Sequence, residues 1–199
     1  GDKPGSYHFD AVVLDSKKPA MMIAEHLLSL GHTHFAYVTT PVHGQEVGRI
    51  RRLAGIRQCL EEHGLPEDHL EILSTSRKEF AKYPGDRAEY QNGYDRTIEA
   101  LQNGTAYTAF IGNNDMTALG IMDAITKLGY KIPFASMKQI SLTTIEHATV
   151  QKGHEAVDLI HKKHSQDHSG RQPSYTVRLE YEPQLIVRNS TGKCRKNLR

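Results

Sequence analysis

Residues 107–133 constrain the fold more than any other part of this sequence. Residues 108–111 form a compact apolar run, as expected of a strand that is covered on both faces. Asn113, Asn114 and Asp115 follow with side-chain acceptors for the first free N–H groups of a helix. Apolar residues then recur at helical spacing until a glycine ends the helix. Because open α/β sheets bind ligands where a strand runs into a helix, the stretch predicts a binding elbow at the carboxyl end of a parallel strand.

The same alternation runs through most of the chain. Apolar runs predict strands at residues 11–14, 34–39, 70–73 and 108–111, and the segments after them predict helices at 20–30, 49–63, 88–102 and 114–128. Residues 74–87 are polar and are expected to be irregular. Later segments predict a strand or extended crossover at 140–145, a helix at 149–164 and strands at 175–179 and 185–188. This pattern is typical of an α/β fold with a parallel sheet wrapped on both faces.

Composition bounds the domain count and the class. The chain has 199 residues, enough for one large domain or two small lobes, and a net charge of only +2 that demands no nucleic-acid partner. The basic stretch 193–199 is interpreted as a solvated chain end. Two cysteines, Cys59 and Cys194, form no framework, which favours a reduced cytosolic compartment. We find no apolar run near the roughly 20 residues of a membrane span, and no signal peptide at the start.

Five short motifs stand in a fixed order at residues 25–32, 52–55, 114–120, 142–145 and 183–191. In that order they resemble the effector-binding domains of LacI/GalR-type transcriptional regulators. The same domain also occurs behind GntR-type DNA-binding heads, and the arabinose repressors of bacilli are the type most similar to residues 21–34 and 134–135. Each motif alone is weak, whereas their order across residues 15–191 is specific.

This resemblance implies a periplasmic-binding-protein-like fold, in which two doubly wound α/β lobes are joined by three crossovers and hold the ligand in the cleft between them. This chain would then cover mainly the C-terminal lobe. Residues 1–15 would be the end of the N-terminal lobe and the first crossover, and the basic tail would follow the last strands. The remaining expected divisions are the C-terminal lobe at 16–147, a helix returning to the N-terminal lobe at 148–173, and C-terminal-lobe strands at 174–192.

The sequence departs from the family pattern in two places. The family's N-terminal lobe and DNA-binding head precede the point where this sequence begins. The family also continues after the Ile-Pro pair with a strand that ends in a Gly-Phe-Asp-Asp-like motif, whereas here Pro133 is followed directly by Phe134. A missing central strand would leave unpaired edges inside the sheet, which favours omission of the segment from this sequence over its deletion from the polypeptide.

Two polar residues are the leading ligand-binding candidates. Arg52 lies in the first turns of its expected helix and faces the elbow if the sheet is doubly wound, and its guanidinium can hold two neighbouring oxygens at once. The alternative is a surface arginine among several on that helix. Asn114 offers an acceptor and two donors, which suits a sugar hydroxyl, while its alternative is a helix N-cap. The resemblance assigns both residues to the effector.

Three further positions are weaker candidates. Asp15 either contacts ligand or merely ends its strand. Asp115 is the second member of the family's Asn-Asp pair, and the resemblance gives this aspartate a structural role more often than a contact with ligand. The family stacks an aromatic ring on the sugar from a loop near residue 88, where this chain has alanine. Tyr90 or Tyr83 would have to substitute, although both are ordinary as loop or helix-surface tyrosines.

Catalytic and metal patterns are not found. His161, His164 and His168 share a region, but no cysteine or carboxylate completes a four-ligand set. The sequence has no nucleophile elbow and no phosphate-cradling loop. No cofactor is expected, and an α/β enzyme is the least favoured class.

The sequence therefore predicts a cytoplasmic, sugar-sensing domain of a bacterial transcriptional repressor. Sugar bound between the lobes would alter operator DNA binding by a head outside this chain, because a ligand that prefers one lobe arrangement shifts the equilibrium between arrangements. The helix at 114–128 would help form a homodimer. The alternative is a solute-binding protein of a sugar transporter, which an upstream export signal would favour.

Overall fold

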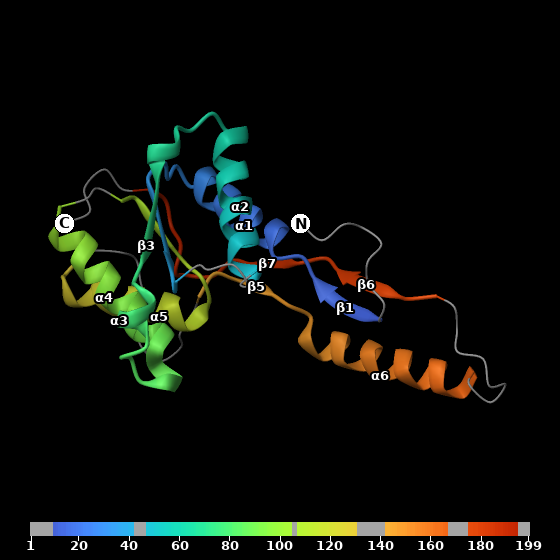
Figure 1. The fold of residues 1–199 in the computed structure, drawn as a ribbon. Helices are drawn as coiled ribbons and strands as arrows, with labels where there is room; N and C mark the ends of the chain where they lie inside the picture. The colour runs from blue at the N-terminus through green and yellow to red at the C-terminus, as the bar shows by residue number, and fades with distance from the viewer. Residues whose placement is uncertain (1–9, 42–46, 105–106, 131–141, 167–174, 195–199) are drawn as a thin grey trace. The chain divides into compact units, whose positions relative to one another are not determined.

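The computed structural model of the chain describes residues 10–41, 47–104, 107–130, 142–166 and 175–194. The chain divides into two compact units (Figure 1). The small unit comprises Gly1–Asp15 and Glu146–Gln184, and the large unit comprises Ser16–Ile145 and Leu185–Arg199. Where the chain passes between units, β5 (Thr144–Glu146) and β7 (Gln184–Ile186) form a two-stranded sheet.

The large unit is built on a parallel sheet in the order β3-β2-β4. In β2, alternate residues face opposite sides, so Phe35 and Tyr37 contact one helix layer while Ala36 and Val38 contact the other. The first layer is α1 with α2, and the second is α4 with α5 (Figure 1). The main elements are α1 (Lys17–Ser29), β2 (Phe35–Thr39), α2 (Val47–Glu62), β3 (Leu70–Ser74), α4 (Ala88–Gln102), β4 (Ala109–Gly112) and α5 (Asp115–Lys127). The short helix η1 (Glu67–His69) precedes β3. Two more, α3 (Arg77–Phe80) and η2 (Gly85–Arg87), lie between β3 and α4.

Burial is concentrated on the central strand of this sheet. All five residues of β2 are buried, as a strand covered on both faces requires. Cys59 is buried in the α1–α2 layer, and neither it nor Cys194 forms a disulfide. None of the helices in the described part of the chain is long and apolar enough to cross a membrane.

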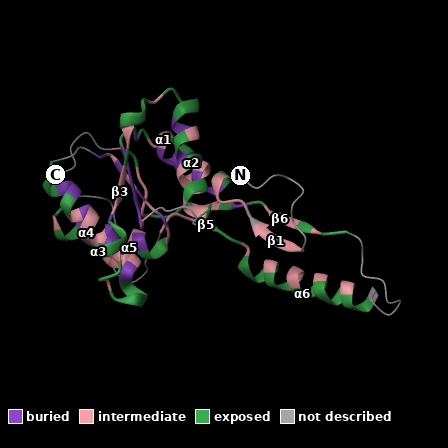
Figure 2. Ribbon diagram, viewed as in Figure 1, coloured by how far each residue is buried: buried purple, intermediate pink, exposed green. Residues whose placement is uncertain are grey.

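The small unit contains β1 (Ala11–Leu14), α6 (Thr149–Gln166) and β6 (Arg178–Tyr181). β1 and β6 pair in parallel, and Lys163 of α6 binds the Asp10 carboxylate at 2.7 Å just before β1. Over residues 149–165, α6 has no buried residue, and it is largely exposed in Figure 2. This unit therefore has little core of its own.

Most predicted elements are confirmed to within a few residues, and two predictions are wrong. The segment 74–87 was expected to be irregular, but it contains α3, which is started by a capping box between Ser76 and Glu79. The strand expected at 175–179 is instead Arg178–Tyr181. The strand expected at 140–145 appears as Thr144–Glu146, and the Pro133–Phe134 junction lies outside the described residues.

Candidate ligand-binding site

The elbow predicted from the sequence lies at the carboxyl end of β4. Val38 of β2 is in register with Gly112 of β4, so the two parallel strands end side by side. The Asn113 N–H still donates to the Val38 carbonyl at 2.9 Å, and the chain then turns into α5. Asn113 is buried, and its side chain is therefore held at the edge where parallel sheets bind ligands.

Arg52 reaches this edge from α2, as predicted. Its Nη1 donates to the Asn113 backbone carbonyl at 3.0 Å and to Asn113 Oδ1 at 3.1 Å. The hydroxyl of Tyr37 donates to the same Oδ1 at 3.0 Å, and burial raises the pKa of this phenol, which keeps it a donor. The Nε and Nη2 donors of Arg52 have no partner among the described residues, so they are available to a ligand.

Asn114 combines the two roles that the sequence left open. Its Oδ1 accepts from the Thr117 N–H at 2.9 Å, which caps α5. Its amide group donates to the carboxylate of Glu89 on α4, and that carboxylate also lies 3.5 Å from Nη2 of Arg49. We call Arg49, Arg52, Glu89, Asn113 and Asn114 the elbow cluster.

The other candidate residues are placed elsewhere. Asp115 accepts from the Thr144 hydroxyl at 2.9 Å, and Asp15 belongs to the small unit. The Tyr90 hydroxyl donates to Asp123 at 2.6 Å, an interaction that raises its pKa to about 12. Tyr83 packs edge-on against Phe80. The ligand roles of Asp15, Asp115, Tyr90 and Tyr83 stay predictions.

Sequence reasoning missed four residues of this arrangement. Arg49 was counted only among the surface arginines of its helix. Tyr37 stands in a strand whose other residues, apart from the threonine at its end, are apolar. A buried tyrosine needs a hydrogen-bond partner, so it carried a usable signal. Asn113 was identified only as an acceptor for the helix start. Glu89 carried no signal, because an acidic residue in the first turn of a helix is common.

No group of three histidine, cysteine or carboxylate side chains that could hold a metal ion occurs within the described residues. His161 and His164 are exposed on α6, and His168 lies outside the described residues. The elbow cluster offers guanidinium and amide donors and carboxylate and amide acceptors. Such a set suits a neutral ligand rich in hydroxyl groups.

Residues 24–191 match the periplasmic binding protein-like domain. The chain belongs to this family. The predicted fold class is therefore confirmed, and so is the resemblance to LacI-type regulators, since relatives and solved structures of that kind match almost the whole chain.

Two curated relatives are similar over most of this chain. The HTH-type transcriptional regulator DegA of Bacillus subtilis (strain 168) is 29% identical over 203 residues, which cover 96% of this chain and 54% of that protein. The arabinose metabolism transcriptional repressor of Geobacillus stearothermophilus is 26% identical over 196 residues, which cover 90% of this chain and 49% of that protein. This periplasmic-binding-protein-like chain thus spans about half the length of both relatives.

Solved structures agree with the family assignment. A LacI family transcriptional regulator from Enterococcus faecium, crystallised with bound ribose, superposes with a TM-score of 0.73 at 25% identity. The match covers 96% of this chain and 68% of that one. A dimeric Lac repressor shares the fold, with a TM-score of 0.66 at 23% identity, over 92% of this chain and 65% of that one.

Proposed function

We propose that this chain is part of the effector-sensing region of a bacterial transcriptional repressor, and that a small sugar binds at the elbow cluster. The observation that carries the proposal is the position of Arg52, whose guanidinium is fixed by Asn113 at the carboxyl ends of β2 and β4 with three N–H donors left over. The family, its repressor relatives and the ribose bound by the Enterococcus faecium regulator support a sugar as the ligand class.

The chemistry of the cluster fits sugar hydroxyls, each of which is both donor and acceptor. Arg52 donates two parallel hydrogen bonds to neighbouring hydroxyl or ring oxygens, while the Glu89 carboxylate accepts from a hydroxyl. Arg49 and Asn114 hold that carboxylate in place. Because Asn113, whose Oδ1 also accepts from the Tyr37 hydroxyl, already fixes the guanidinium, little side-chain entropy remains to be lost on binding.

In the whole protein, bound sugar would change operator affinity by favouring one arrangement of the sensor over another. The DNA-binding head, the dimer contact through α5 and the cytoplasmic location belong to this proposal, as does the expectation that bound sugar is not turned over. The HTH-type name of the Bacillus subtilis relative supports the DNA-binding head, and the dimeric Lac repressor supports a dimer. This chain spans only about half of the curated relatives.

Isothermal titration calorimetry of the purified chain with ribose, arabinose and other pentoses and hexoses tests the sugar site. One sugar should bind, and Arg52→Ala should weaken it by about tenfold or more, because charge-assisted hydrogen bonds are lost. Arg57→Ala is the matched control on the same helix, since the pair that Arg57 forms with Glu67 at 3.6 Å is exposed. Equal affinities of the wild type and Arg52→Ala would contradict the assignment, and so would a wild type that binds no sugar.

A further inference from the structure

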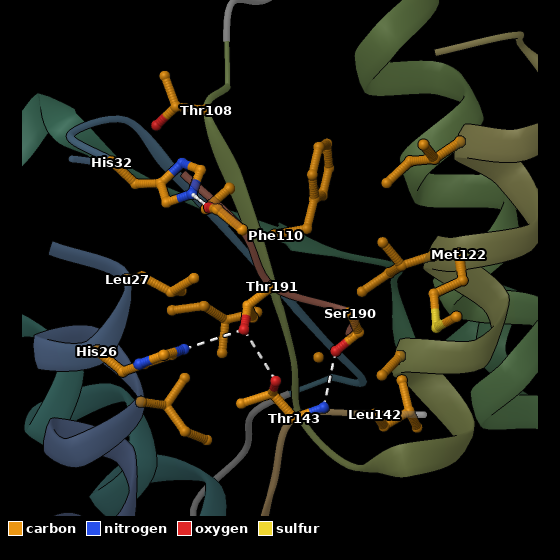
Figure 3. A pocket seen from close by; sticks show the side chains of 18 of the residues that line it. His26, Leu27, His32, Thr108, Phe110, Met122, Leu142, Thr143, Ser190 and Thr191 are labelled. Atoms are coloured by element: carbon orange, nitrogen blue, oxygen red, sulfur yellow. Dashed lines mark hydrogen bonds between the residues drawn. The ribbon is translucent and has the colours of Figure 1, made fainter. Parts of the chain in front are cut away.

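We propose that the large unit has a second binding site, at which two histidines hold a divalent transition-metal ion of the Zn²⁺ class. The two are His34, directly before β2, and His69, directly before β3, and their rings are stacked with centroids 4.1 Å apart and planes inclined by 26°. Neither lines the pocket shown in Figure 3, whose histidines, His26 and His32, lie within hydrogen-bond distance of residues 191–192. The ion site is therefore a separate feature of the large unit.

The first argument is the register of the sheet, which brings the two histidines together. Phe35 of β2 is in register with Leu70 of β3, so the residues before them, His34 and His69, lie side by side where these parallel strands begin. His34 is exposed and His69 is half-buried, so an ion in solution can reach both rings. The elbow cluster lies at the carboxyl ends of the strands, which is the opposite end of the sheet.

The second argument is the position of the ring protons, which Thr33 controls. His69 Nδ1 lies 2.9 Å from the Thr33 carbonyl oxygen, which can only accept, so Nδ1 carries the proton and Nε2 keeps its lone pair. His34 Nδ1 lies 3.1 Å from the Thr33 hydroxyl, which can accept a proton from that ring in the same way. Neither Nε2 has a partner among the described residues. Histidines that bind metals usually have this arrangement, with the other ring nitrogen donating to an oxygen.

The third argument is the spacing of the rings, which suits one shared ion. Zn²⁺ binds imidazole nitrogen at about 2.0–2.1 Å, so two nitrogens on one tetrahedral ion lie roughly 3.3 Å apart. The centroids of the two rings are 4.1 Å apart. Because both Nδ1 atoms bind Thr33, both Nε2 atoms lie on the ring sides away from it. The ring torsion of histidine is broad, so a small rotation of each ring closes the remaining distance.

The backbone that carries these acceptors is itself held in place. The Thr108 hydroxyl, directly before β4 and labelled in Figure 3, accepts from the N–H groups of Thr33 and His34 at 3.1 Å each. It also donates to the His34 carbonyl at 3.0 Å. No third histidine, cysteine or carboxylate joins the pair within the part of the chain that the structure describes, so water would fill the remaining positions on the ion. Two imidazoles suit Zn²⁺, Cu²⁺ or Ni²⁺, whereas Mg²⁺ and Ca²⁺ require oxygen ligands.

The test is isothermal titration calorimetry of the whole chain with ZnCl₂, and with MgCl₂ as the comparison ion. Zn²⁺ should bind and Mg²⁺ should not. His34→Gln and His69→Gln should each weaken one Zn²⁺ binding event by about tenfold or more, because one of its two protein ligands is lost. His161→Gln is the matched control, since it removes an exposed histidine from α6 and should leave this binding event unchanged.

A further variant tests the orienting role of Thr33. Thr33→Val keeps both histidines and removes only the hydroxyl that orients His34, so it should weaken Zn²⁺ by about tenfold. Circular dichroism reports whether each variant is folded, and the comparison of Zn²⁺ with Mg²⁺ needs no variant at all. The proposal is overturned if the wild type binds no Zn²⁺, if Mg²⁺ binds equally well, or if both glutamine variants keep the wild-type affinity. Sugar titrations of the same variants separate this test from that of the elbow cluster, which these substitutions do not touch.

Discussion

Replacing Gly120 by alanine should destabilise the large unit, although alanine is the better helix former. Gly120 of α5 faces α4, and a Cβ built there would lie 2.1 Å from the carbonyl oxygen of Tyr90 and 2.8 Å from the backbone nitrogen of Tyr94. Across the same helix crossing, a Cβ at Gly93 would lie 2.3 Å from the carbonyl oxygen of Thr117. Both partner atoms are backbone, so no side chain can rotate away to relieve the contact.

The magnitude follows from two opposing terms. An ordinary contact begins near 3.4 Å, so the helices would have to separate locally by 3.4 − 2.1 = 1.3 Å. Overpacking of this kind costs about 3 kcal/mol at the upper end of its usual range, and separation also loosens the contacts of Ile121 and Ile125. Alanine regains about 1 kcal/mol of helix propensity. The net loss should therefore be about 2 kcal/mol or more.

Urea unfolding followed by circular dichroism measures this loss. Gly48→Ala in α2 is the matched control, because Ser16 Oγ, at an ordinary 3.6 Å, is the one atom of the described residues that a Cβ there would meet. It should be neutral, or stabilising by up to about 1 kcal/mol. If Gly120→Ala unfolds within about 0.5 kcal/mol of the wild type, the reasoning about the α4–α5 contact is refuted.

Three further predictions concern single side chains. Burial lowers the pKa of His26 below its ordinary 6.5, so the folded state favours the neutral ring. The free energy of unfolding should therefore keep its full value above pH 6.5 and fall as the pH drops towards the lowered pKa. In urea titrations at several pH values, His26→Gln should make this fall less steep. Tyr37→Phe should cost about 0.5–1.5 kcal/mol in the same assay, because one hydrogen bond to Asn113 is lost. The N–H and hydroxyl of Ser76 hold the pKa of Glu79 at about 2, so the capping box should persist above pH 4.5 and weaken as the pH falls towards 2, which an NMR titration of that carboxyl group measures.

Local patterns in the sequence were sufficient for the elbow. The apolar run before Asn113 and the acceptors after it specify a strand and a helix start through contacts only a few residues apart. The reach of Arg52 to this elbow also followed, because a doubly wound sheet places the helix after one strand beside the end of the next.

The bounds of β6 and the contact of Glu89 with Asn114 depend on residues far apart in the sequence, so local patterns could not predict them. Residues 175–177 are as strand-like as Arg178–Tyr181, but register with Ala11–Leu14 selects the latter for β6. Glu89 reaches Asn114 only because α4 and α5 approach closely at Gly93 and Gly120. Neither spacing nor composition reveals such an approach before the fold is known.

The elbow cluster depends on that helix crossing. Asn114 belongs to the start of α5 and Glu89 to the start of α4, so their hydrogen bond keeps its geometry only while the two helices stay in contact. Arg52 is held by Asn113, whose own position is set by the β2–β4 ladder. The donors and acceptors offered to a ligand therefore come from two parts of the large unit that are held by different contacts. One part is the edge of the sheet, and the other is the pair of helices α4 and α5, which pack closely at Gly93 and Gly120. A substitution at the α4–α5 crossing should for this reason disturb the hydrogen bond between Asn114 and Glu89 more than the one between Arg52 and Asn113.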